Sequence, residues 1–205
     1  MIRPIVKYGE HVLHQPAENV SDITGELAAL VQDMIQTMYA APGIGLAAPQ
    51  IGIPLRVFVV DVSAGRTPNS VVTLINPEFV ERDGMQLEEE GCLSVPGFNA
   101  TVARPAKAVL KGLDLDGQER VIEGTGLLAR ALQHEMDHLD GRVFVDRLRG
   151  IQRELIVRRI RKLTRSGKWE IARFAVSGSS FSAPPISPCR RSKCCWTRRI
   201  RWLEW

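Results

Sequence analysis

Two histidines and a glutamate, His134, Glu135 and His138, are the residues of this 205-residue sequence best arranged to do chemistry. In the run QHEMDH the histidines stand four positions apart, so on a helix both imidazoles face one side and can reach a single metal ion. Glu135 lies one position further round, where it can exchange protons with a water on that ion. Two solvated histidines on an amphipathic helix fit this short pattern equally well.

A hydrolytic metal site needs a third protein ligand and an open position for water. Glu154 is the only glutamate besides Glu170 in the forty residues that follow QHEMDH, but its basic surroundings, QRELIVRRI, favour a solvated partner for arginines. Cys92, within EEEGCLSVPG (88–97), is the only cysteine before residue 189, and a thiolate is a strong ligand for borderline-soft ions. A buried, inert cysteine is the alternative interpretation of Cys92.

Helices and strands in separate runs are predicted to position these residues. Apolar side chains recur at steps of three and four over about 24–39, about 125–140 and 146–165, which predicts three helices. Strands are predicted at 55–62 and 71–77, the second ended by Pro77, and a hairpin at 107–124 turns at Asp116-Gly117. This order indicates an α+β fold with a helix packed against a sheet.

Composition narrows the class of protein. The sequence is 44% hydrophobic and 24% charged, as in soluble globular proteins. No apolar run is long enough for a signal peptide or a membrane span, so we expect a cytosolic protein with no membrane partner. Of the charged residues, 166–205 hold 8 of 27 basic but only 2 of 23 acidic ones, so the +4 net charge arises from this end. Nothing in the remainder requires sequence-specific nucleic acid as a partner.

From Ser166 onward the sequence is rich in Ser, Pro, Arg and Trp and shows no sustained period. We interpret 166–205 as a poorly ordered basic extension. Its cysteines, Cys189, Cys194 and Cys195, lack the spacing of a zinc site.

Three segments resemble the signature motifs of peptide deformylases, in order and with family-like separation: GIGLAAPQ (43–50), EGCLS (90–94) and QHEMDH (133–138). The likeness extends to about Arg165. It implies a deformylase-like α+β catalytic domain, residues 1–165, with antiparallel or mixed sheets packed around a central helix that carries HEMDH. The implied enzyme is a cytoplasmic bacterial, or organellar, hydrolase that removes the formyl group from the N-terminal formylmethionine of newly synthesised polypeptides.

The resemblance also implies roles for the motif residues. The metal ligands would be Cys92, His134 and His138, around one divalent ion that is commonly Fe²⁺ in this family, with Zn²⁺, Ni²⁺ or Co²⁺ accepted. Glu135 would take the proton of the water activated by this ion and deliver it to the departing amine. The Gln50 side chain and the Leu93 backbone N–H would stabilise the oxyanion.

Substrate is expected to lie extended against Ile44, Gly45 and Gly91, as an added strand would. Leu127 and Ala131 are expected to line a pocket for methionine, although Leu127 fits core packing equally well. Arg130 lies near this pocket, where either a rim position or a solvated charge is compatible with the sequence.

Residues around the ligands are expected to orient them. Glu90 and Arg104 are candidates for a buried pair near Cys92, and Asp137 for a contact that steadies the HEMDH helix. Surface pairing is the alternative for all three.

Three further readings stay open on the sequence alone. The basic helix at 146–165 has either a solvated face or a face that contacts ribosomal RNA phosphates. The chain is alternatively an H-E-x-x-H endopeptidase with Glu154 as third ligand. The last alternative is an inactive, deformylase-like binding module, although no residue of the three motifs is missing.

Overall fold

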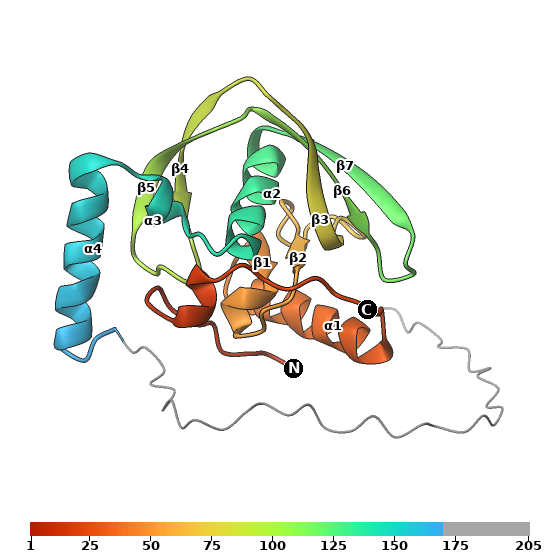
Figure 1. Ribbon diagram of the computed structural model, residues 1–205, viewed down its shortest axis with the longest axis horizontal. Helices are drawn as coiled ribbons and strands as arrows, with labels where there is room; N and C mark the ends of the chain where they lie inside the picture. The colour runs from red at the N-terminus through yellow and green to blue at the C-terminus, as the bar shows by residue number, and fades with distance from the viewer. Residues whose placement is uncertain (170–205) are drawn as a thin grey trace. The chain divides into compact units, whose positions relative to one another are not determined.

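The helix that carries HEMDH, α2 (Gly126–Leu139), stands between two antiparallel sheets in the computed structural model, which describes residues 1–169 (Figure 1). One sheet has five strands in the order β1-β2-β3-β6-β7. Their bounds are Gly45–Ala47, Val57–Val60, Val72–Asp83, Lys107–Leu113 and Glu119–Thr125. The other sheet pairs β4 (Gln86–Gly91) with β5 (Asn99–Arg104). The α+β prediction is confirmed.

Strand β2 explains why the predicted strand at 55–62 is apolar at consecutive positions. All four of its residues are buried. Because side chains alternate across a strand, Val57 and Val59 join the core on the side of α1 (Gly25–Ala40), whereas Phe58 and Val60 join the core beneath α2. Both faces of the five-stranded sheet are therefore covered by a helix.

Helix α1 forms as predicted. The side chain of Thr24 accepts a hydrogen bond from the backbone N–H of Leu27 and so caps the first turn. Its apolar stripe is buried, and it consists of Leu27, Leu30, Val31, Met34 and Met38. Two short 3₁₀ helices complete this side, η1 (His11–His14) and η2 (Ala48–Ile51).

Two glycines allow close approaches around α2. A Cβ on Gly124 in β7 would lie 2.9 Å from Cγ of Leu128 and 3.0 Å from the backbone nitrogen of Ala129, so the first turn of α2 packs directly on the strand. After α2, Gly141 has a φ of 71°, and a Cβ there would lie 2.7 Å from the carbonyl carbon of Gln15. A side chain at either position would push α2 out of place.

The prediction that Pro77 ends its strand was wrong, because β3 continues to Asp83. The ladder between β3 and β6 is irregular between Ile75 and Glu78, where the register shifts. Pro77 lies in this irregular stretch, where its missing N–H breaks no regular ladder bond. The predicted hairpin is confirmed, since β6 and β7 are joined by a turn in which Gly117 has a φ of 75°.

The single helix predicted at 146–165 is in fact two. A short helix, α3 (Phe144–Arg147), is followed by α4 (Gly150–Arg165). The chain is extended at Leu148 and Arg149, and Gly150 has a φ of 59°, which a continuous helix cannot contain. In Figure 1, α4 lies on the outer side of α3 and β5.

Residues 166–169 follow α4, and Trp169 is only 4% exposed. Its indole N–H donates to the carbonyl of Tyr8 at 3.0 Å, and its ring meets that of Phe98 edge to face. The rest of the predicted extension, with Cys189, Cys194 and Cys195, lies outside the described residues. Among residues 1–169, the helices are too short or too polar to cross a membrane.

Candidate metal centre

Cys92, His134 and His138 converge at one point. Cys92 follows the last residue of β4, and the histidines lie one turn apart on α2. One ligand atom from each of the three lies within 4.8 Å of the other two, and Cys92 Sγ is 3.3 Å from His138 Nε2. The sequence predicts the shared helix face, whereas only the fold brings the thiol of Cys92 to it.

This donor set fits a divalent ion. Burial alone would raise the pKa of the Cys92 thiol, but the imidazoles of His138 and His134 outweigh burial and bring the pKa down to about 5. A thiolate is thus favoured at neutral pH, and thiolate sulfur is the form that binds metal. Thiolate sulfur and imidazole nitrogen are both common ligands of zinc and similar borderline ions.

Glu135 lies beside the cluster and is only 3% exposed. Its Oε2 has no hydrogen-bond partner among the described residues, and burial raises its pKa to about 7. A Cβ on Gly45 would collide with Oε1 of Glu135 and lie 2.9 Å from its Cδ. Gly45 therefore leaves the space that the carboxylate occupies, close to the cluster of Cys92, His134 and His138.

Gln50 is held in one orientation by its own backbone neighbours. Its Oε1 accepts a hydrogen bond of 2.8 Å from the backbone N–H of Ala47. The opposite end of the amide, Nε2, lies 3.6 Å from Cys92 Sγ and 3.4 Å from Ser94 Oγ. The donor end of the side chain is thereby directed at the cluster.

A pocket of about 360 Å³ opens beside these groups. Its walls include all the predicted substrate-binding residues and the predicted oxyanion donors, namely Ile44, Gly45, Gln50, Gly91, Leu93, Leu127 and Ala131. Leu127 is 46% exposed, so it lies at the mouth and not in the core. Arg130 also lines the pocket, and its Nη1 donates to the carbonyl of Glu89 at 3.2 Å, which places it at the rim.

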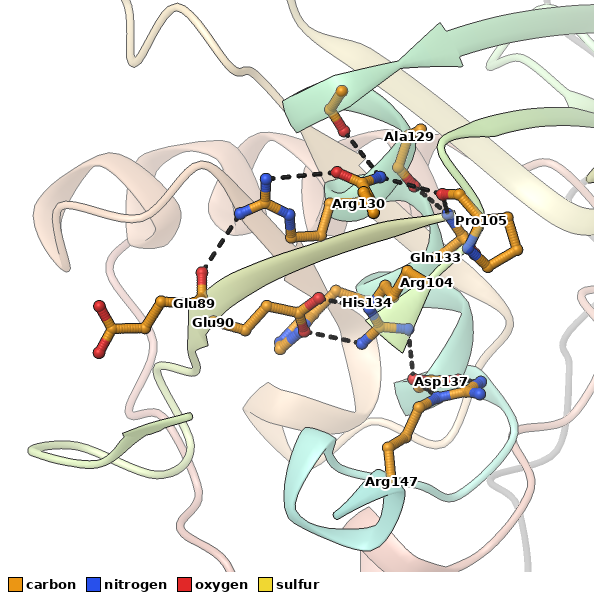
Figure 2. Close-up of polar contacts among 12 residues, drawn as sticks. Glu89, Glu90, Arg104, Pro105, Ala129, Arg130, Gln133, His134, Asp137 and Arg147 are labelled. Carbon is orange, nitrogen blue, oxygen red and sulfur yellow. Dashed lines mark hydrogen bonds and ion pairs between the residues drawn. The ribbon is translucent and has the colours of Figure 1, made fainter. Parts of the chain in front are cut away.

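Behind this cluster lies a chain of buried charges (Figure 2). His134 Nδ1 is 3.1 Å from Glu90 Oε2, and the same carboxylate accepts from Nε and Nη2 of Arg104, the latter at 2.8 Å. Arg104 Nη1 donates to Asp137 Oδ2 at 2.9 Å. Despite burial, these hydrogen bonds hold the pKa of the Glu90 carboxyl below its ordinary value. Of the three predicted supporting residues, Arg104 thus contacts both Glu90 and Asp137.

Two residues of this region were missed from sequence. Arg147 of α3 binds Asp137 through Nε at 2.6 Å and through Nη2, and Ser94 lies beside the Gln50 amide. No periodic pattern links residue 147 to residue 137, because the contact depends on the turn that follows α2. Glu154 lies exposed on α4, outside the cluster of possible metal ligands found among residues 1–169.

Comparison with known proteins gives one consistent result. The sequence profile of the polypeptide deformylase family matches residues 2–154. The peptide deformylase of Acidobacterium capsulatum is 52% identical over 169 residues, which cover 82% of this chain and 99% of the relative. That of Thermodesulfovibrio yellowstonii is 51% identical over 154 residues, covering 75% of this chain and 93% of the relative.

Solved structures agree with the sequence relatives. The crystal structure of a peptide deformylase from Legionella pneumophila superposes with a TM-score of 0.76 at 41% identity, covering 83% of this chain and 99% of that one. The peptide deformylase from Synechococcus elongatus in complex with actinonin has a TM-score of 0.73 at 39% identity, covering 85% of this chain and 89% of that one.

Proposed function

This chain belongs to the polypeptide deformylase family, and we propose that Cys92, His134 and His138 hold the divalent ion of its active site. The enzyme hydrolyses the formyl amide of N-terminal formylmethionine on newly made polypeptides and releases formate. The observation that carries the metal assignment is the convergence of one thiol and two imidazoles within 4.8 Å. A bound divalent ion would lower the pKa of a water molecule enough for that water to lose a proton near neutral pH.

Glu135 is the general base and acid of this proposal. In the metal-free protein burial raises the pKa of the Glu135 carboxyl to about 7, a direction that suits a group which accepts a proton and then returns it. Because Oε2 has no competing partner among the described residues, it is available for the proton of the attacking water. The same oxygen then delivers this proton to the amine that leaves when the formyl group is removed.

Gln50 and Leu93 stabilise the formyl oxygen as it gains negative charge. The Gln50 amide needs no reorientation during the reaction, since Ala47 already fixes its acceptor end. Preorganised hydrogen-bond donors of this kind make the largest single contribution to the rate enhancement of many enzymes. The second donor is the backbone N–H of Leu93, next to Cys92 in the pocket wall.

The substrate chain lies extended between β1 and the end of β4. Ile44, Gly45 and Gly91 all line the pocket, where their backbone groups can pair with any peptide. The methionine side chain enters beside Leu127 and Ala131. Backbone pairing with a single side-chain pocket suits an enzyme that acts on many different polypeptides.

Glu90, Arg104 and Asp137 orient the ligands. The Glu90 carboxylate holds Nδ1 of His134 and thereby directs its other ring nitrogen to the ion. Arg104 in turn fixes Glu90, and Asp137 fixes Arg104. All three side chains are at least 95% buried, so water does not compete for these contacts.

Fe²⁺ is proposed as the physiological ion, on the strength of the family resemblance alone. Thiolate and imidazole also bind Zn²⁺, Ni²⁺ and Co²⁺. The cytoplasm is the proposed location, in keeping with bacterial relatives and with a substrate made there. Metal content after strictly anaerobic purification from iron-replete cells tests the choice of ion, and a preparation containing zinc but no iron would contradict it.

Contact with the ribosome is proposed through α4. Its exposed basic residues, Arg153, Arg158, Arg159, Arg161, Lys162 and Arg165, can meet RNA phosphates beside the exit of the nascent chain. Co-sedimentation with ribosomes should weaken as salt is raised, and Arg158→Glu/Arg159→Glu should weaken it further. If neither the added salt nor the double substitution weakens co-sedimentation, the ribosome is not a partner of α4.

The test of the central proposal measures metal content and formate release from formyl-Met-Ala. Wild-type protein should bind one divalent ion and release formate, whereas Cys92→Ala should lose both. Cys189→Ala, which removes a thiol outside the described residues, is the control. Full metal occupancy in Cys92→Ala would overturn the ligand assignment.

A further inference from the structure

The chain of buried charges behind His134 does not end at Asp137. Arg147, the last residue of α3, donates to both carboxylate oxygens of Asp137. Its side chain is 35% exposed, whereas those of Asp137, Arg104 and Glu90 are at most 4% exposed. Figure 2 shows the series running from His134 through Glu90, Arg104 and Asp137 to Arg147.

Charge alternates along this series. Glu90 and Asp137 are carboxylates, Arg104 and Arg147 are guanidinium groups, and together the four have no formal net charge. Without Arg147 the buried part would carry an excess negative charge at Asp137, which is expensive in a site closed to water. Arg147 is therefore the group that balances the series where it reaches solvent.

The geometry also shows how a change at Arg147 would reach the ligands. Asp137 Oδ2 accepts from Arg147 Nε at 2.6 Å and from Arg104 Nη1 at 2.9 Å. If the first donor is removed, Asp137 has only Arg104 as a side-chain partner among the described contacts. Arg104 is then drawn toward Asp137 and away from Glu90, the carboxylate that holds His134.

We propose that Arg147 is a positioning residue of the metal site, which acts on His134 through Asp137, Arg104 and Glu90. This inference rests on the proposed ligand set of Cys92, His134 and His138. It adds a member from α3, outside the three sequence motifs and ten positions beyond Asp137. Arg147 touches neither ion nor substrate, so its effect is on the orientation and affinity of the site.

The experiment uses the full-length protein loaded with Zn²⁺ or Co²⁺. Zn²⁺ affinity is measured by chelator competition, and the visible absorption bands of the Co²⁺ form report the ligand geometry. Partners that orient metal ligands typically contribute 10- to 100-fold to metal affinity, and we expect Arg147→Met to weaken Zn²⁺ binding about 10-fold. The Co²⁺ bands of this variant should shift. Arg147→Lys, which keeps the charge, should lie between wild type and Arg147→Met.

Arg120→Met is the matched control, because Arg120 makes a surface ion pair with Asp114 at 2.9 Å and does not touch the series. It should change neither readout. A second variant, Asp137→Asn/Arg147→Met, removes the unbalanced carboxylate and should recover part of the lost affinity, even if Arg147→Met folds poorly.

Zn²⁺ affinity within 2-fold of wild type and unchanged Co²⁺ bands in Arg147→Met would overturn the inference, whatever happens to its stability. Equal losses in Arg147→Lys and Arg147→Met would overturn the charge-balance argument. A wild-type protein that binds no metal would instead overturn the ligand assignment itself, so the two failures are distinguishable.

Discussion

Helices α1 and α2 cover opposite faces of the same five-stranded sheet, yet they bury different kinds of side chain. The buried residues of α1 are apolar apart from Thr37. Helix α2 packs Leu132 and Met136 against the sheet and also buries Gln133, Glu135, Asp137 and His138. Helix α1 thus contributes mainly to stability, whereas α2 also buries the polar side chains of the proposed active site.

The polar side of α2 is tolerated because its groups have specific neighbours. Gln133 Nε2 donates to the carbonyls of Pro105 and Ala129, and Asp137 accepts from two arginines. Buried polar groups without such partners cost free energy, so they need a functional reason. Three buried side-chain atoms of α2 have no hydrogen-bond partner among the described residues, namely Arg130 Nε, Glu135 Oε2 and His138 Nδ1. All three belong to residues at or beside the proposed active site. The buried polar atoms that lack hydrogen bonds therefore lie on the side of α2 that faces the proposed active site.

The largest effect on turnover is expected for Glu135→Gln, which tests the role assigned to α2. The variant keeps the size of the side chain but cannot carry the proton, so turnover should fall by about 10²–10⁴-fold. Metal content should remain that of wild type, because Glu135 is not a ligand. Glu154→Gln is the control and should keep full activity. Near-normal turnover of Glu135→Gln in a formate assay would place the proton transfer elsewhere.

On α1 the corresponding test is Met34→Ala, at a position that is fully buried. The cavity should lower the free energy of unfolding by about 2–5 kcal/mol, as measured by urea denaturation. Zn²⁺ affinity and turnover of the folded variant should stay within a factor of two. Exposed Gln32→Ala is the control, with no measurable change. A loss of metal affinity in Met34→Ala would show that the two faces of the sheet are coupled.

A third test compares the buried carboxylates of the two sides. Asp61 follows β2 and accepts hydrogen bonds from Tyr39 of α1, from Ser70 and from the backbone of Ser63 and Gly65. Burial alone would raise the pKa of Asp61, but these donors outweigh it and hold the pKa well below its ordinary value. For Glu135, burial prevails and the pKa rises.

The shift at Asp61 predicts a pH-dependent effect of Asp61→Asn. Since the folded pKa lies below the unfolded value of about 3.9, the ionised carboxylate stabilises the protein above that pH, and this contribution is lost as pH falls through the folded pKa. The substitution should cost about 2 kcal/mol at pH 7. The difference from wild type should shrink between about pH 5 and pH 3. A difference in the free energy of unfolding between the variant and wild type that is the same at pH 7 and at pH 3 would contradict the assignment.

The same contrast explains what sequence reasoning could reach. The stripe of α1 follows from helical periodicity, and the burial of β2 follows from its unbroken run of apolar residues. The HEMDH face follows from helical spacing. Cys92 could not be chosen from the residues alone, because a lone cysteine is usually inert, and only the three motifs taken together indicated its role.

Other features depend on contacts that no local pattern encodes. The continuation of β3 beyond Pro77 depends on a register shift against β6, and the break between α3 and α4 depends on Gly150. Arg147 reaches Asp137 only because the chain turns back after α2. The docking of Trp169 on Tyr8 was hidden by the change in composition at Ser166.

The smallest expected effect distinguishes the first turns of the two helices. Thr24 caps α1 through its hydroxyl, whereas Thr125, at the same position before α2, makes no such hydrogen bond. Thr24→Ala should therefore lower the free energy of unfolding by about 1 kcal/mol, and Thr125→Ala should lower it by much less. Because the first turn of α2 packs directly on Gly124 of β7, packing holds this turn in place, whereas the first turn of α1 needs a cap. Equal losses in urea denaturation would mean that capping, and not packing, also fixes the start of the helix that carries the proposed active site.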